Sequence, residues 1–299
     1  MSGGTTQCEE AAERSEVPLR RAAILGAGLL GASVGLAIRQ RWPSAEVRGW
    51  SRRAETREAA LERGAVTSIH ADLQSAAEGC QLVVVGTPID QIAEHAIAAA
   101  RVVERAGLIT DVGSTKASIV AAVERDSQAA DCFIGSHPLA GGERTGPAHA
   151  RADLLRDRVV VLTPTARTTP QLVERAADFW QQLGARIVRL TPEEHDGALA
   201  ATSHAPHVIA ASLAASLPEA WLPLVASGWR DSTRIAASDP GLWRQILLDN
   251  SASVLQEIAR FARVLDEFRM AIETHDGAQL ESLLRNARQR RLDGDPHHR

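Results

Sequence analysis

The first two thirds of the chain alternate between short apolar runs and longer segments in which apolar residues recur every three or four positions. A run of about five apolar residues predicts a buried strand, and the helical spacing predicts an amphipathic helix, such as the one that ends at Arg41 before Pro43. Regular alternation of the two is typical of an α/β fold built on a doubly wound, Rossmann-like parallel sheet. The predicted strands are 21–25, 46–50, 81–88, 108–113, 132–138, 159–163 and 186–190.

Beyond Leu190 the strand pattern stops, and the chain is predicted to be helical to its end. The sequence Thr191-Pro192-Glu193-Glu194 combines an N-cap residue, a proline at the first helical position and an acidic residue that closes a capping box. Asp239-Pro240 opens another helix in the same way. We expect Gly277 to end that helix and a last helix to run over 279–291. The C-terminal third is therefore predicted to be an all-helical domain.

A narrow apolar stripe extends along the helix that follows Asp239. Its members are separated by 7, 4, 3, 4, 3 and 4 residues, which is the spacing of a coiled-coil seam. A helix with such a stripe packs along a second helix, from the same chain or from another copy. Because the stripe is long, we expect a homodimer formed through the helical domain. The stripe consists of Leu247, Val254, Ile258, Phe261, Leu265, Phe268 and Ile272.

Composition and charge narrow the range of partners. The 299 residues carry a formal net charge of −4, which gives no global attraction to nucleic acid or to an acidic membrane. No apolar run is long enough to span a bilayer, and the first 18 residues are polar. Cys8, Cys80 and Cys132 are too scattered for a disulfide framework and predict free thiols in a reducing compartment. We expect a cytoplasmic protein that acts on a small molecule.

A glycine-spaced turn, Gly26-Ala27-Gly28-Leu29-Leu30-Gly31, joins the first predicted strand to the first predicted helix. In a dinucleotide-binding turn, the first glycine permits the tight turn, the second lets the backbone approach a pyrophosphate, and the third allows close packing of helix on strand. The helix N-terminus supplies amides and a positive dipole to the anion. The same spacing occurs in ordinary tight turns, but its place between strand and helix favours a dinucleotide site that includes Leu29 and Leu30.

The end of the second predicted strand bears on which dinucleotide is bound. An acidic residue about 20 residues beyond the glycines binds the ribose hydroxyls of NAD, whereas this chain has Ser51 there, followed by Arg52 and Arg53. A hydroxyl and guanidinium groups bind a 2′-phosphate that a carboxylate would repel. The sequence therefore favours NADP, with NAD possible. The alternative is that both arginines are solvated surface charges.

Candidate catalytic residues follow the predicted strands, because ligands of open parallel sheets bind at the carboxyl ends of the strands. Thr87 and Pro88 follow one strand and are assigned to the cofactor, Ser114 follows the next, and His137 ends a third. An imidazole, which titrates near neutral pH, is suited to take the proton of an alcohol while hydride leaves the same carbon. The alternatives are that His137 caps a buried backbone group and that Ser114 is the N-cap of the following helix.

The helical domain contributes basic candidates. His204 and His207 form a His-x-x-His pair that resembles a metal site, but no third ligand lies at a suitable spacing, so we expect no metal. Arg230 and Arg234 lie four residues apart, on one face of a predicted helix, where they suit an anionic substrate. A structural salt bridge to a neighbouring aspartate is the alternative for either arginine.

Five sequence blocks occur together in the order typical of prephenate/arogenate dehydrogenases, and the chain resembles that family over residues 20–275. The resemblance implies an oxidative decarboxylation in tyrosine biosynthesis, in which prephenate gives 4-hydroxyphenylpyruvate, or arogenate gives tyrosine, and hydride passes to NAD(P)+. It also implies a dinucleotide-binding domain followed by a helical domain that dimerises. The blocks are Asp111–Lys116, Ser136–Glu143, Glu194–Asp196, Ser203–His207 and Arg230–Pro240.

Position by position, the resemblance implies roles for the matched side chains. His137 matches the base that acts on the ring hydroxyl, and Ser114 matches the serine that bonds that hydroxyl. His207 and Arg234 match substrate-binding positions, and Arg234 suits a carboxylate. Glu143 and Trp243 match positions that line the pocket, whereas His195, His204 and Asp231 match positions with mainly structural roles.

The expected organisation is a disordered lead at 1–18, a dinucleotide-binding domain at 19–190, a helical substrate and dimerisation domain at 191–292, and a frayed tail at 293–299, without a regulatory domain or a fused chorismate mutase. Two other interpretations compete with this one, namely another two-domain dehydrogenase, of the β-hydroxyacid or imine-reducing kind, and a non-catalytic nicotinamide-binding sensor. A β-hydroxyacid dehydrogenase would place a catalytic lysine in the helical half, but the only lysine is Lys116; an imine reductase has no evident use for His137 and Arg234. A non-catalytic nicotinamide sensor needs no base and no anion clamp.

Overall fold

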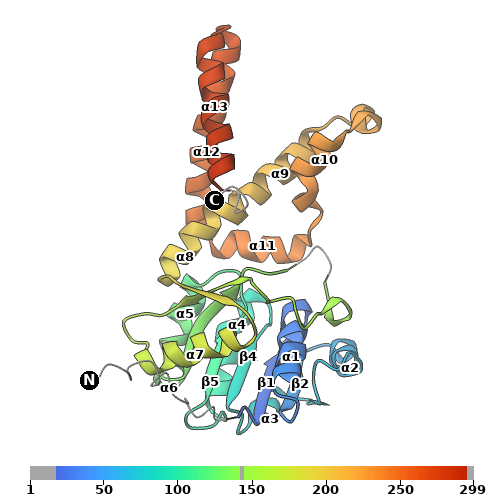
Figure 1. Cartoon of the computed structure of the whole chain (residues 1–299), viewed down its shortest axis with the longest axis vertical. Coiled ribbons are helices and arrows are strands. Elements are labelled where there is room, and N and C mark those ends of the chain that lie inside the picture. Colours follow the sequence, from blue (N-terminus) through green and yellow to red (C-terminus); the bar gives the residue numbers. More distant parts are fainter. Residues whose placement is uncertain (1–17, 142–144, 295–299) are drawn as a thin grey trace, which may run out of the picture. The chain divides into compact units, whose positions relative to one another are not determined.

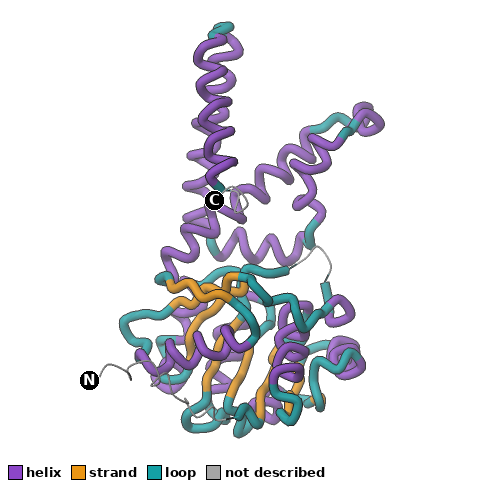
Figure 2. Tube along the Cα trace, viewed as in Figure 1, coloured by secondary structure: helices purple, strands orange, loops and turns teal. Residues whose placement is uncertain are grey.

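The computed structural model describes residues 18–141 and 145–294, which form two compact units. The first unit extends to His195 and also contains Ser238–Ile246, and the second unit contains Asp196–Ala237 and the chain from Leu247 onward. All strands belong to the first unit, and the second is helical (Figure 2). The expectations for the N-terminal lead and for Glu143 lie outside the described residues.

The first unit is built on one eight-stranded sheet, with the strand order β3-β2-β1-β4-β5-β6-β7-β8. Figure 1 labels β2, β1, β4 and β5, which are neighbours in this order. The order runs outward from β1 in one direction and from β4 in the other, so the predicted doubly wound sheet is confirmed. The switch point lies between β1 and β4, where ligands of such sheets bind. The strands are β1 (Arg21–Leu25), β2 (Glu46–Trp50), β3 (Ser68–Ile69), β4 (Leu82–Val85), β5 (Leu108–Asp111), β6 (Phe133–Pro138), β7 (Val159–Thr163) and β8 (Arg186–Arg189).

One pair of strands departs from the predicted parallel arrangement. Strand β7 runs antiparallel to β6, with His137 opposite Val161, whereas the other neighbouring pairs are parallel. A parallel crossover usually runs through an α-helix. The described part of the β6–β7 connection has only the 3₁₀ turn η1 (Pro147–His149), so the chain turns back beside β6.

Helices cover both faces of the sheet, because successive strand residues point to opposite sides. Ala22 and Ile24 of β1 belong to a core with residues of α1 and α7, whereas Ala23 and Leu25 belong to a core with residues of α3, α4 and α5. The helices of this unit are α1 (Leu29–Arg41), α2 (Ala54–Glu62), α3 (Leu73–Ala77), α4 (Ile89–Ala100), α5 (Ala117–Val123), α6 (Ser127–Ala130) and α7 (Pro170–Gln182).

The predicted capping box at Thr191 is confirmed as the start of α8 (Pro192–Leu199). The backbone amide of Glu194 donates to Oγ1 of Thr191 at 3.1 Å, and the amide of Thr191 donates to Oε2 of Glu194 at 2.8 Å. The chain then continues through the π-helical turn η2 (Ala200–His204), α9 (Ala205–Ser216), η3 (Glu219–Leu224), α10 (Ser227–Thr233), η4 (Arg234–Ala237), α11 (Pro240–Asp249), α12 (Ser251–Glu273) and α13 (Gly277–Asp293).

Two helix boundaries near the C-terminus differ from the prediction. The apolar stripe is divided between two helices, because Leu247 lies on α11 and the remaining members lie on α12, beyond a break at Asn250. Helix α12 ends at Glu273, and Gly277 begins α13 instead of ending a helix. The reason is that the Asp276 side chain accepts a hydrogen bond from the Gln279 amide at 2.9 Å and so caps α13.

Candidate functional site

The glycine turn has the geometry of a phosphate cradle. Gly26 has a φ of +95°, and a Cβ there would overlap the Gly86 backbone. A Cβ on Gly31 would overlap the Gly26 carbonyl oxygen, so α1 can pack on β1 only without a side chain at that position. A Cβ on Gly28 would meet no atom within 4 Å. Open space thus lies in front of the backbone at the N-terminus of α1, where Leu29 and Leu30 form the first turn and their amides suit an anion.

A pocket of about 170 Å³ opens beside this turn. The Ser51 hydroxyl is buried and accepts a hydrogen bond from the Ala27 amide at 2.9 Å, which ties the end of β2 to the glycine turn. Arg57 of α2 donates to the Ser51 carbonyl oxygen at 2.6 Å and so holds the segment that carries Arg52 and Arg53. The pocket is lined by Gly26, Gly28, Trp50, Ser51, Arg52, Arg53, Thr56, Gly86, Thr87, Pro88 and Gln91.

The lining of this pocket fits the phosphate and ribose groups of a dinucleotide. It combines exposed guanidinium groups with hydroxyl groups beside a helix N-terminus. Seven residues predicted for the cofactor meet here, namely Gly26, Gly28, Ser51, Arg52, Arg53, Thr87 and Pro88. Four lining residues were not predicted, namely Trp50, Thr56, Gly86 and Gln91. Thr56 and Gln91 lie in the first turn of a helix that follows a strand.

The Thr87 side chain forms a hydrogen bond with His95 of α4. The Thr87 Oγ1 and the His95 Nδ1 are 2.9 Å apart, and the His95 ring meets the Trp50 ring edge-on, with 5.2 Å between centroids. Burial lowers the pKa of His95, which favours its neutral form. The neutral His95 ring can donate or accept a hydrogen bond and adds no positive charge beside the pocket.

The second group of candidates lies at the carboxyl ends of β5 and β6, where Asp111 is the common anchor. Its Oδ1 accepts from the Ser136 amide at 2.9 Å, and its Oδ2 accepts from the Gly113 amide at 2.8 Å. Oδ2 also pairs with Lys116, and both side chains of this ion pair are fully buried. One carboxylate therefore fixes the residue before His137 and the residue before Ser114.

His137 itself is buried, with 8% of its surface exposed, and its ring contacts a second histidine. The His137 Nδ1 lies 2.9 Å from the Nε2 of His195, whose side chain is fully buried in the first turn of α8. Ser114 lies in the turn after β5, two residues before Lys116, which is the N-cap of α5. The interpretation of Ser114 as a helix N-cap is therefore wrong.

In the second unit, His207 lies on α9 and is buried, and this burial lowers the pKa of its imidazole. Arg234 follows the end of α10 at Thr233 and begins the 3₁₀ turn η4. Arg230 therefore lies within α10, and Arg234 is the C-cap residue of that helix, in the right-handed helical conformation. At the last residue of α10, the Thr233 hydroxyl donates a hydrogen bond to the Trp229 carbonyl oxygen at 2.7 Å.

The other candidates are placed as follows. The His204 Nδ1 lies 3.1 Å from the Asn250 side-chain amide, so His204 has a structural partner. Over residues 18–141 and 145–294, no group of three His, Cys, Asp or Glu side chains is arranged to hold a metal ion. Trp243 lies on α11, in the first unit, and packs half-buried against the core that contains Ile246.

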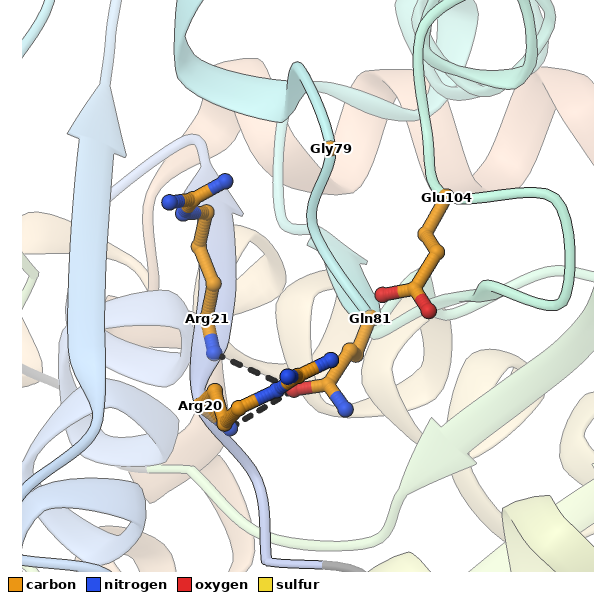
Figure 3. A pocket seen from close by; sticks show the side chains of 5 residues that line it. All are labelled: Arg20, Arg21, Gly79, Gln81 and Glu104. Atoms are coloured by element: carbon orange, nitrogen blue, oxygen red, sulfur yellow. Dashed lines mark hydrogen bonds between the residues drawn. The ribbon is translucent and has the colours of Figure 1, made fainter.

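A larger pocket, of about 270 Å³, lies at the opposite edge of the sheet, where β1 and β4 begin (Figure 3). The backbone amides of Arg20 and Arg21 both donate to Oε1 of Gln81, at 2.6 and 3.3 Å. These bonds join the starts of the two strands. Because ligands of parallel sheets bind at the carboxyl ends, we assign this pocket no catalytic role.

The described part of the chain contains no helix with the length and apolar character needed to cross a bilayer. Of the three cysteines, Cys80 and Cys132 are described, and both are free thiols. Burial raises the pKa of each to about 11, so neither is a reactive thiolate near neutral pH.

The fold and the glycine turn define a dinucleotide-binding protein with a helical second unit, and comparison with known proteins identifies the family. Residues 34–189 match the nucleotide-binding domain of prephenate dehydrogenase, and residues 191–286 match its dimerization domain. The chain therefore belongs to the prephenate dehydrogenase family, as the sequence blocks predicted. This result decides against the β-hydroxyacid dehydrogenase, the imine reductase and the non-catalytic sensor.

Individual relatives support the same assignment. The chain is 34% identical to a cyclohexadienyl dehydrogenase of Zymomonas mobilis, over 90% of this chain and 94% of the relative. The structure of prephenate dehydrogenase from A. aeolicus in complex with hydroxyphenyl propionate and NAD+ has a TM-score of 0.86 and 26% identity, and covers 94% of this chain and 100% of its own. Synechocystis arogenate dehydrogenase has a TM-score of 0.77 and 29% identity, with 91% and 98% covered.

Proposed function

We propose that this chain oxidises and decarboxylates prephenate or arogenate, with His137 as the base. The observation that carries this proposal is the anchoring of His137 and of the Ser114 turn by one buried carboxylate, at the carboxyl ends of β5 and β6. The pocket beside Gly26 and Gly28 would hold a nicotinamide cofactor, which would supply the acceptor for the hydride from the ring carbon that bears the hydroxyl. His137 takes the hydroxyl proton, and Ser114 hydrogen-bonds the same oxygen. The bond from the ring to its carboxylate then breaks, carbon dioxide leaves, and the electron pair makes the ring aromatic.

The substrate-binding groups of the second unit belong to the same proposal. Arg234 is exposed, and its guanidinium group has the fork of donors that suits a substrate carboxylate. His207, whose pKa is lowered by burial, acts as a neutral hydrogen-bonding group. We assign Trp243 and Glu143 to the pocket lining, the latter from the sequence alone. Arg234→Gln should raise the KM for the substrate far more than the KM for the cofactor, and an unchanged substrate KM would contradict the assignment.

Replacement of the base tests the proposed reaction. His137→Asn removes the proton acceptor, so kcat should fall by about 100-fold or more, while the Kd for the cofactor stays within about twofold of wild type. Reduced-nicotinamide formation is measured with prephenate and with arogenate, each against NADP and NAD. His149→Asn, an exposed histidine of the same unit, is the control. Equal losses of kcat and of cofactor affinity in His137→Asn would instead show a structural role.

We also propose a preference for NADP over NAD. Arg52 and Arg53 are exposed at the mouth of the cofactor pocket, and Thr56 adds a hydroxyl group from the first turn of α2. No carboxylate is among the lining residues. Replacing both arginines by Ala should weaken NADP binding at least tenfold and leave NAD binding nearly unchanged. An unchanged ratio of the two affinities would leave the arginines as surface charges, and Arg105→Ala, also exposed, is the control.

Finally, we propose that the second unit forms a homodimer. Helix α12 leaves apolar side chains exposed over the predicted stripe, including Leu265 with 56% and Ile272 with 61% of their surface accessible. The match of this region to a dimerization domain supports the same conclusion. Leu265→Glu should convert the dimer into monomers in light scattering after size exclusion, because it places a charge in an apolar interface. A monomeric wild-type protein would refute the proposal.

A further inference from the structure

The hydrogen bond between the His137 and His195 rings bears on which nitrogen of the proposed base carries a hydrogen. Two ring nitrogens 2.9 Å apart share one hydrogen, so one of them donates and the other accepts. The rings meet at an angle of 64°, with 5.1 Å between centroids. His195 is fully buried in the first turn of α8, and its backbone amide donates to the Thr191 carbonyl oxygen at 2.9 Å. The capping box that starts α8 therefore also fixes the second histidine.

The direction of this hydrogen bond decides whether His137 can act as a base. If the His195 Nε2 carries the hydrogen and donates it, the neutral His137 has its own hydrogen on Nε2 and offers no lone pair there. If His137 donates from Nδ1, its Nε2 has a lone pair that can take a proton, and the neutral His195 carries its hydrogen on Nδ1. Only the second arrangement is compatible with proton abstraction.

We propose that His195 is a positioning residue that holds His137 in the tautomer with hydrogen on Nδ1. This inference rests on the proposed function, in which His137 takes the hydroxyl proton. The role is the one that a carboxylate has beside the histidine of a Ser-His-Asp triad, where the partner fixes tautomer and ring orientation. Here the acceptor is the Nε2 atom of a second imidazole. It orients the ring, and after proton uptake it accepts a charge-assisted hydrogen bond from the His137 imidazolium.

A pair of matched substitutions separates this role from simple packing. His195→Leu keeps an apolar side chain of similar bulk but removes the acceptor, and we expect kcat to fall about 10- to 100-fold with little change in substrate KM or in cofactor Kd. His195→Gln places an amide oxygen near the position of the lost Nε2, so it should recover most of the lost kcat. Melting temperatures and circular dichroism establish that both variants are folded.

The tautomer of His137 can be read directly in the wild-type protein. Protein labelled with ¹⁵N at histidine is examined by long-range proton–nitrogen correlation at a pH where the ring is neutral, and the His137 signals are assigned by their loss in His137→Asn. We expect a protonated Nδ1 and an unprotonated Nε2 in the wild type and in His195→Gln. In His195→Leu we expect hydrogen to move, in part or completely, to Nε2.

Two results would overturn the proposal. One is a wild-type His137 with its hydrogen on Nε2, and the other is a folded His195→Gln that is no more active than His195→Leu. Failure of the proposed function gives a different result, because His137→Asn would then retain turnover while the nitrogen signals still report the tautomer. The two failures are therefore distinguishable.

Discussion

Lys116→Met should be among the most destabilising single changes in the first unit. Lys116 is the only lysine of the chain, and it pairs with Asp111 where both side chains are fully buried. Methionine fills a similar volume but leaves the carboxylate without its cation. Removing one partner of a buried ion pair costs about 3–5 kcal/mol. Two backbone amides, those of Gly113 and Ser136, still donate to the carboxylate, so we expect a loss near the lower limit, about 3 kcal/mol.

Urea unfolding measures this loss, which is large against a typical total stability of about 5–15 kcal/mol. The second variant is Lys116→Met combined with Asp111→Asn, which removes the orphaned charge but also removes the acceptor of one backbone amide, so it should recover at most about 1 kcal/mol. Arg101→Met breaks the exposed pair with Asp126 and serves as the control, with a much smaller effect expected. A cost below about 1 kcal/mol for Lys116→Met would refute the reasoning.

The remaining predictions concern the glycine turn and the pH dependence of stability. Gly28→Ala should fold with an unchanged melting temperature but bind the cofactor at least tenfold more weakly, because its Cβ enters open space that the cofactor needs. Gly31→Ala should melt at a lower temperature, because its Cβ overlaps the Gly26 carbonyl oxygen; the reverse pattern in thermal melts and cofactor titrations would contradict both. Burial lowers the pKa of His207 below the usual 6.5, so the unfolded chain binds this proton more tightly than the folded protein. The contribution of His207 to stability is therefore fully present above pH 6.5 and is lost as the pH falls through the lowered value, and His207→Gln should show a smaller loss of unfolding free energy over this range.

Local signals explain the parts of the fold that the sequence predicted well. Strands β1, β2 and β7 begin and end where the apolar runs do, and α1 ends at Arg41 as the following Pro43 requires. The predicted direction of β7 was wrong, because an apolar run does not indicate the direction of a strand. The connection from β6 determines that direction. Strand β3 was missed because two residues are too few to show a period.

The candidate site likewise has residues whose position the sequence predicted and residues whose position it did not. Ser51, Thr87 and His137 end predicted strands, so their common edge of the sheet followed from topology. Asp111 belongs to one of the five sequence blocks, but nothing in the neighbouring sequence shows that its carboxylate reaches the Ser136 amide, 25 residues further on. The contact of His195 with His137 spans 58 residues and depends on where α8 begins relative to β6.

His137 is consequently fixed from two sides by groups with different tasks. Its backbone is fixed through Ser136, whose amide is bonded by the Asp111–Lys116 pair, and its ring is fixed by His195. Loss of Lys116 should therefore reduce stability and disturb where the imidazole lies, but it should not change which nitrogen carries the hydrogen. Loss of the His195 acceptor should change the tautomer and leave the strand in place. A ¹⁵N spectrum of folded Lys116→Met with the wild-type tautomer of His137 would support this separation, and a changed tautomer would show that the two anchors act as one.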